Sequence, residues 1–150
     1  MPSFEEELQL IFIHSINALK ESMWDTMKSL ELELTPVSFM ALKIIHQQKM
    51  CTAHTISTTT GKDKGQVTRI VKDLLAQQLI EKQAHPMDKR SQILTLTEQG
   101  KSIFIQLQKA DLAALNAMKT GLSDEQITNF MSIGRTMVNN IQQHNVNRKN

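Results

Sequence analysis

Apolar residues recur every three or four positions at both ends of the chain, a pattern typical of amphipathic helices. Residues 5–30 carry the first apolar stripe, made of Leu8, Phe12, Ile16, Leu19, Met23, Met27 and Leu30. Two further stripes follow Thr97 and Ser123, which are suitable helix N-caps, and run to Met118 and Ile141. The pattern therefore predicts one long helix at the start of the chain and two at its end.

Three shorter helices are predicted between these ends. Thr35 followed by Pro36 is a typical helix start, because the first turn leaves unpaired the N–H that proline lacks. Residues 52–61 are rich in Thr and Ser, so their helix propensity is low and one or two turns are expected. The helix prediction for residues 63–77 is stronger, since Asp63 with a glutamine three residues later makes a capping-box-like start.

The pattern changes to a period of two after this helix. Leu94 and Leu96 alternate with Thr95 and Thr97, as expected of a strand with one buried face. Pro86 and the polar tract MDKRS separate this segment from the preceding apolar one, which predicts a two-stranded hairpin.

The predicted order is a long helix, three helices, a hairpin and two long helices. A short helix, a turn, a second helix and a hairpin together predict a winged helix-turn-helix, so the fold class is mainly α (α+β). We expect one chain-long architecture over residues 1–150, with a DNA-binding lobe at 34–97. The helices in 1–33 and 98–145 carry more apolar surface than one small chain can cover, which predicts a dimerisation region built from both termini.

The distribution of charge along the chain is more informative than the net charge, which is only +2. Residues 1–34 hold seven acidic and two basic side chains, a net charge of −5. Residues 61–90 hold seven basic and four acidic side chains, a net charge of +3. A nucleic-acid surface is therefore expected in the middle third of the chain.

The helix at 63–77 is the candidate recognition helix, because the N-terminal part of such a helix reaches base edges in the major groove. Arg69 suits guanine or a phosphate, Gln66 has the amide geometry for adenine, and Gly65 lets the backbone approach a phosphate. The expected DNA-contacting residues of this segment are Lys62, Lys64, Gly65, Gln66, Thr68, Arg69 and Lys72.

The turn of the hairpin is the second candidate DNA contact. Arg90 suits the minor groove, and Asp88 is expected to orient its guanidinium through a charge-assisted hydrogen bond. Lys89 is the expected phosphate contact of the turn. The expected wing residues are His85, Asp88, Lys89 and Arg90.

Residues 61–100 resemble the MarR family of bacterial transcription regulators. The most specific part is the pattern P-x-D-x-R followed by L-T-x-x-G, and the segments LTPVSFMAL (34–42) and GLSDEQITNF (121–130) are similar to the family too. The resemblance implies an obligate homodimer formed by the first and last two helices. It also implies binding to a palindromic double-stranded operator, with Arg90 of the wing reaching the minor groove.

Three residues depart from the family pattern. Gln78 stands where the family usually has a turn glycine, and Lys82 where it usually has arginine. Lys62 replaces a common apolar residue ahead of the recognition helix. The first departure affects the geometry of the helix-to-strand turn. The other two affect the details of the expected contacts with DNA.

The sequence gives little support for metal binding, oxidant sensing or catalysis. Cys51 and His54 form one C-x-x-H pair without a second pair at zinc-site spacing, so we expect neither a metal site nor a cofactor. A buried, inert thiol is expected for Cys51, rather than an oxidant sensor. The residues form no catalytic constellation, so we do not expect an enzyme. The acidic N-terminus does not resemble a secretory signal and no long apolar run occurs, which together with a single cysteine favours the cytoplasm.

Two functional hypotheses follow. The first is a homodimeric, sequence-specific DNA-binding regulator, a repressor released by a small-molecule effector of unknown identity. The alternative is a winged-helix adaptor that binds another protein and no specific DNA sequence.

Overall fold

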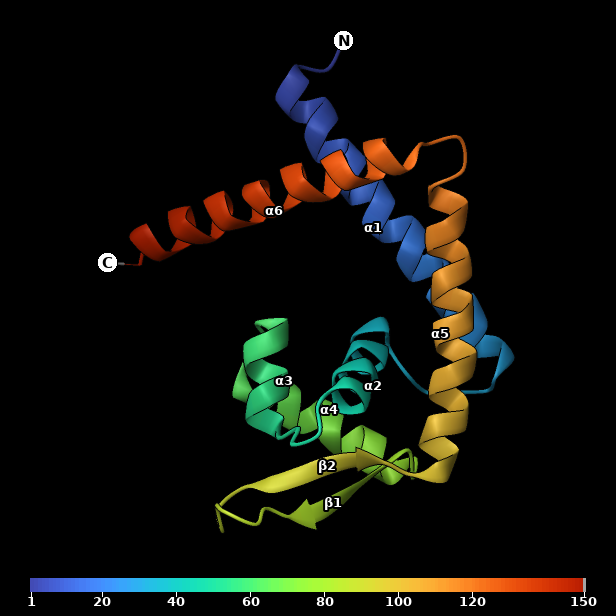
Figure 1. Cartoon of the computed structure of the whole chain (residues 1–150), viewed down its shortest axis with the longest axis vertical. Coiled ribbons are helices and arrows are strands. Elements are labelled where there is room, and N and C mark those ends of the chain that lie inside the picture. Colours follow the sequence, from blue (N-terminus) through green and yellow to red (C-terminus); the bar gives the residue numbers. More distant parts are fainter. Residues whose placement is uncertain (150) are drawn as a thin grey trace. The chain divides into compact units, whose positions relative to one another are not determined.

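The computed structural model describes residues 1–149 and contains six helices and one hairpin in the predicted order (Figure 1). The elements are α1 (Phe4–Ser29), α2 (Pro36–Gln47), α3 (Ala53–Thr60), α4 (Lys64–Ala76), β1 (Ile80–Ala84), β2 (Gln92–Leu96), α5 (Glu98–Met118) and α6 (Asp124–Asn147). This arrangement confirms the winged helix-turn-helix prediction. The chain divides into two compact units, residues 1–114 and the segment from residue 115 onward.

Side-chain caps set where the helices begin. The Thr35 hydroxyl accepts from the backbone N–H of Ser38, and capping boxes begin α3 at Thr52, α4 at Asp63 and α6 at Ser123. Each cap satisfies N–H groups that the first helical turn leaves without a partner. The predicted starts at Thr35, Asp63 and Ser123 are confirmed, and the Thr-rich α3 is a regular helix of eight residues.

The turn from α4 to β1 keeps its left-handed geometry without a glycine. Gln78 has a φ of 58°, the N–H of Leu79 donates to the carbonyl of Leu74, and the N–H of Gln78 donates to the carbonyl of Leu75. These two bonds are the Schellman pattern that closes a helix C-terminus. Glutamine therefore preserves this turn, although the left-handed conformation is less favourable for a residue with a side chain than for glycine.

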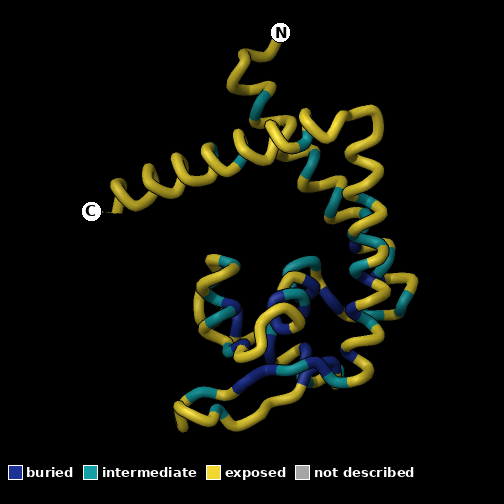
Figure 2. The backbone as a smooth tube through the Cα atoms, in the orientation of Figure 1, coloured by how far each residue is buried: buried dark blue, intermediate teal, exposed yellow. Residues whose placement is uncertain are grey.

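The core of the first unit lies between the end of α1, the helices α2, α3 and α4, the hairpin and the start of α5, where the buried residues cluster (Figure 2). Phe39 of α2 stacks on Phe104 of α5 with ring centroids 6.0 Å apart. Beside this pair, the Lys43 ammonium lies 3.2 Å from the Asp111 carboxylate. The lobe therefore packs against α5 as far as Asp111.

A backbone junction fixes the start of α5 against the α4–β1 turn. The N–H of Thr97 donates to the carbonyl of Leu79, and the Thr97 hydroxyl donates to the carbonyl of Gln78 at 2.6 Å. The same hydroxyl accepts from the N–H of Gly100, so Thr97 is the predicted N-cap of α5. Because Gly100 has no side chain, α5 approaches the backbone at Leu79 closely.

The hairpin pairs antiparallel, with Ile80 opposite Leu96 and Ala84 opposite Gln92. The expected alternation on β2 is only partly present, because Ile93 is buried as well as Leu94 and Leu96. The N–H of Leu94 also donates to the carbonyl of Cys51 at 2.7 Å, which ties β2 to the residue just before the α3 N-cap.

The terminal helices leave most of their apolar stripes uncovered. In α1 only Met23 and Met27 are buried, and in α5 the buried positions end at Leu107. In α6 none of the described residues is buried. Among residues 1–149, no helix is long and apolar enough to cross a membrane.

Candidate nucleic-acid interface

The predicted recognition helix, α4, separates its apolar and polar side chains cleanly. Val67, Val71 and Leu74 are buried against the lobe. All six of its predicted DNA-contacting residues are exposed, namely Lys64, Gly65, Gln66, Thr68, Arg69 and Lys72. Lys62 is half-buried in the preceding loop, where its carbonyl accepts from the Ser57 hydroxyl.

Two polar side chains of α4 are partly engaged with their own helix. The Gln66 amide oxygen accepts from the N–H of Asp63 in the capping box. The Thr68 hydroxyl donates to the carbonyl of Lys64 at 2.8 Å. Because the cap uses only the oxygen of Gln66, its amide N–H groups remain the part suited to a base edge.

The turn between β1 and β2, residues 85–91, is held by two consecutive side-chain caps. The His85 Nδ1 atom accepts from the N–H groups of Met87 and Asp88, at 3.1 and 3.0 Å. The two Asp88 carboxylate oxygens accept from the N–H of Arg90 at 2.9 Å and from the Ser91 hydroxyl at 2.8 Å. We call residues 85–91 the wing turn.

The prediction of a charge-assisted hydrogen bond between the Asp88 carboxylate and the Arg90 guanidinium is wrong. The Asp88 carboxylate binds the Arg90 backbone N–H, and the ion pairs of residues 1–149 lie elsewhere. A carboxylate two residues before an N–H reaches it through a short local turn, whereas the long arginine side chain loses more rotamer freedom to make an exposed pair. The hydrogen bonds from the Arg90 N–H and then from Ser91 lower the Asp88 pKa, so the cap stays ionised.

A cavity of about 640 Å³ opens between α4 and the hairpin. Its lining includes the basic side chains of Lys72, Lys82, Lys89 and Arg90. Carboxylate side chains are absent from the lining residues, which are Thr52, Ala53, His54, Thr68, Val71, Lys72, Leu75, Lys82, Lys89, Arg90, Ser91, Gln92 and Leu94. We call this the basic cavity; a concave site with four cations is suited to a polyanion.

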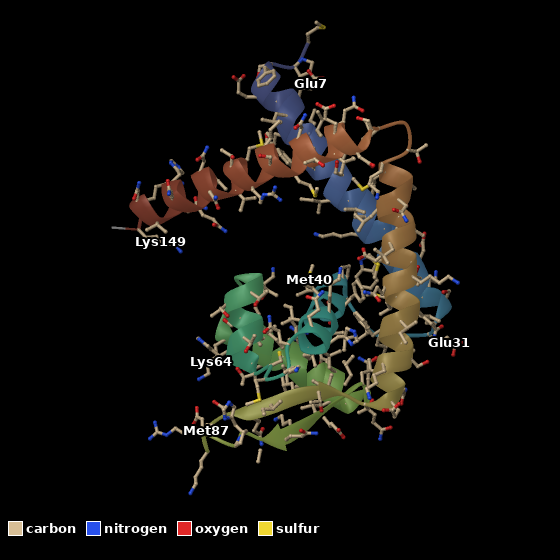
Figure 3. All side chains as sticks on the ribbon, viewed as in Figure 1. Glu7, Glu31, Met40, Lys64, Met87 and Lys149 are labelled. Carbon is tan, nitrogen blue, oxygen red and sulfur yellow. The ribbon has the colours of Figure 1, made fainter. Side chains whose placement is uncertain are left out.

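Figure 3 labels Lys64 at the start of α4 and Met87 at the tip of the wing turn, with side-chain nitrogen atoms around both. Of the predicted residues, Thr68, Lys72, Lys89 and Arg90 meet in the basic cavity. The lining does not include the remaining predicted residues, which are Lys62, Lys64, Gly65, Gln66, Arg69, His85 and Asp88.

Lys82 and His54 also line the basic cavity, and the sequence patterns did not assign them to the site. Lys82 lies opposite Leu94 in the hairpin, on the face shared with Gln92. Strand alternation would have found Lys82 if the hairpin register had been known. His54 lines the cavity because of where α3 packs, and no sequence pattern predicts that position.

Cys51 is fully buried, and its burial raises the pKa of the thiol to about 11. A thiol with a raised pKa and no exposed surface is a poor nucleophile at neutral pH. In residues 1–149, no three His, Cys, Asp or Glu side chains gather as a metal site requires.

A scan against family models matches residues 34–92 to the MarR family. A search of curated proteins gave no significant match.

Solved structures show the same fold. A MarR transcriptional regulator from Methanosarcina mazei Go1 superimposes with a TM-score of 0.77 at 17% identity, covering 92% of this chain and 98% of that one. BpsR from Bordetella bronchiseptica, whose DNA binding is regulated by 6-hydroxynicotinic acid, gives 0.75 at 19% identity over 92% and 97%. A mutant MarR from E. coli complexed with operator DNA gives 0.75 at 17% identity over 87% and 93%.

At these identities the structural likeness shows a shared fold, while the family match rests on the sequence of the lobe itself. The hairpin, the capped α4 and the junction at Thr97 and Gly100 follow the motifs on which the family resemblance depends. Residues 34–92 therefore match the MarR family model, and the chain shares the fold of solved MarR family transcriptional regulators.

Proposed function

We propose that the protein is a homodimeric repressor that binds a palindromic double-stranded operator and is released by a small-molecule effector. The observation that carries this proposal is the basic cavity between α4 and the wing turn, with four cations in its lining. Its lining includes residues of α4 and of the hairpin, the two elements that a winged helix presents to DNA.

The DNA contacts follow from the positions of the side chains. With α4 in the major groove, exposed Arg69 and Gln66 near its N-terminal end face base edges. The backbone between the major groove and the adjacent minor groove then passes over the basic cavity, where Lys72 and Lys89 bind phosphates. Arg90 in the wing turn reaches the minor groove.

The uncovered apolar stripes support the dimer, with 1–33 and 98–145 as the dimerisation region and 34–97 as the DNA-binding lobe. Large side chains remain exposed on the three terminal helices, including Ile11, Phe12 and Ile16 on α1, Leu112, Leu115 and Met118 on α5, and Phe130, Met131, Val138 and Ile141 on α6. Apolar patches of this kind are rare on monomers, and a second copy supplies a matching surface through two-fold symmetry.

Regulation requires that the effector distinguish two states of the dimer. Two recognition helices must lie about 34 Å apart to enter successive major grooves. A ligand bound between the dimer helices and a lobe favours another spacing only through its different affinity for the two states. BpsR, a protein of the same fold, supports an effector-controlled mechanism. A cytoplasmic location is part of this proposal.

Selection from a library of genomic duplexes with the purified full chain tests the proposal. We expect enrichment of a two-fold symmetric sequence, bound with an affinity that falls as salt rises. Undetectable or salt-independent binding to every duplex, measured by fluorescence anisotropy, would refute it. A protein partner that is still captured after Lys64, Arg69 and Lys72 are replaced by alanine would then favour the adaptor alternative.

A further inference from the structure

His85 holds the wing turn in a way that depends on its protonation state. Its Nδ1 atom accepts from two backbone N–H groups at once, those of Met87 and Asp88. A histidine nitrogen can accept only when it carries no proton, so these two bonds require the neutral ring with its proton on Nε2. The sequence pattern placed His85 among the DNA contacts, and the structure gives its ring a backbone role as well.

The two caps of the wing turn are linked through Asp88. The N–H of Asp88 is held by His85, and the carboxylate of Asp88 holds the N–H of Arg90 and the hydroxyl of Ser91. The His85 cap therefore fixes the residue that positions the backbone of Arg90. Arg90 in turn lines the basic cavity.

Protonation of His85 converts its acceptor nitrogen into a donor. Two backbone N–H groups then face a third N–H, and the turn loses both bonds. Among the charged groups around the wing turn, the Asp88 carboxylate interacts electrostatically with the His85 ring. Lys89 and Arg90 follow Asp88 in the same turn, and Lys82 of β1 and Lys72 of α4 line the basic cavity with them.

We propose that neutral His85 is a positioning residue that pre-organises Arg90 for DNA, and that its protonation releases the wing turn and weakens operator binding. The proposal rests on the proposed DNA-binding function. It runs against simple electrostatics, because an added positive charge near DNA strengthens phosphate binding. The sign of the pH effect therefore separates the two explanations.

His85→Asn is the decisive variant. The Asn side-chain oxygen lies at about the same distance from the backbone as Nδ1, so it accepts the same two bonds and does not titrate near neutral pH. His85→Ala removes the acceptor altogether. His46→Asn is the matched control, because the exposed His46 of α2 neither lines the basic cavity nor caps the wing turn.

The first measurement uses the free full-length protein. At pH 8, ring nitrogen NMR should show His85 protonated on Nε2 and not on Nδ1. Between pH 8 and 5.5, the amide signals of Met87 and Asp88 should titrate together with the His85 ring, and should stay fixed in His85→Asn. A ring protonated on Nδ1 at pH 8, or amides that do not follow the ring, would overturn the proposal.

The second measurement uses the duplex obtained by selection. On acidification from pH 8 to 5.5, the wild type and His46→Asn should lose roughly three- to tenfold more affinity than His85→Asn, the loss expected when about one net hydrogen bond is removed. His85→Ala should bind weakly at both pH values. Equal pH profiles of wild type and His85→Asn, or tighter wild-type binding in acid, would overturn the proposal. If no duplex binds, the proposed function fails, while amides that follow the ring still support the role of His85 in the turn.

Discussion

Gly100 at the start of α5 lies directly against the backbone carbonyl of Leu79. A Cβ atom added at Gly100 would come within 1.8 Å of the Leu79 oxygen, a distance that no real contact allows. Gly100→Ala should therefore destabilise the protein by about 2 kcal/mol or more, because backbone rather than a flexible side chain must move. Urea unfolding followed by circular dichroism measures this change. The neighbouring, exposed Gln99→Ala is the control and should leave the midpoint nearly unchanged; equal midpoints for the two variants would contradict the prediction.

Gln78 occupies a left-handed conformation with a φ of 58°. Glycine adopts this conformation without strain, so Gln78→Gly should stabilise the fold by up to about 1 kcal/mol, after the larger entropy of the unfolded chain is counted. Thermal unfolding provides the comparison. Gln77→Gly, one residue earlier at a φ of −85°, should destabilise instead. A lower melting temperature for Gln78→Gly would show that the glutamine side chain contributes to the turn.

The pKa of Cys51, raised to about 11 by burial, makes stability depend on alkaline pH. The unfolded thiol loses its proton from about pH 9 upward while the folded thiol keeps it, so stability is full below pH 9 and falls between pH 9 and 11. The loss should approach about 2–3 kcal/mol relative to Cys51→Ala, whose stability lacks this component. Urea midpoints of both proteins across this range test the prediction, and parallel curves would contradict it. Native Cys51 should also react slowly with thiol reagents at pH 7.5.

Lys72 lines the basic cavity from α4 and should bind a phosphate. Lys72→Ala should reduce the slope of log affinity against log salt by about 0.9 per protomer, without changing the preferred duplex. Fluorescence anisotropy at several salt concentrations gives the slope. Lys109→Ala removes an exposed cation of α5 outside the cavity and should leave the slope unchanged. An altered sequence preference in Lys72→Ala would refute the phosphate assignment.

Arg90→Ala should weaken operator binding by about 1–3 kcal/mol, because a charged donor to DNA is lost. The backbone caps of the wing turn use the N–H of Arg90 and not its guanidinium, so the turn itself should persist. Sedimentation equilibrium should show an unchanged oligomeric state. Wild-type affinity in this variant would mean that the wing does not contact DNA.

Local interactions made much of the fold predictable from sequence. The caps at Thr35, Asp63 and Ser123 need only the side chain and the next three residues, and each is present as expected. The Thr-rich α3 forms despite low propensity, because Thr52 and Thr55 cap it and Ile56 is buried beneath it. Tertiary packing decides the outcome where intrinsic propensity is weak.

The candidate site was less predictable, since it depends on geometry between segments. The register that places Lys82 opposite Leu94 depends on the length and shape of the wing turn, which composition does not specify. The Asp88–Arg90 expectation failed because charge complementarity alone does not show whether a carboxylate meets a side chain or the nearer backbone N–H. The predicted contacts of α4 remain predictions, although each lies on its exposed face.

α6 is a helix of 24 residues in which none of the described side chains is buried. A helix of this composition, with a glycine at position 134, gains little from its own backbone bonds in water. Its order must then come from whatever covers its apolar stripe, and in the proposed dimer that cover is a second chain. Folding of the C-terminal segment would thus be second order in protein concentration, so dilution alone should lower the helix content and hasten amide hydrogen exchange in α6.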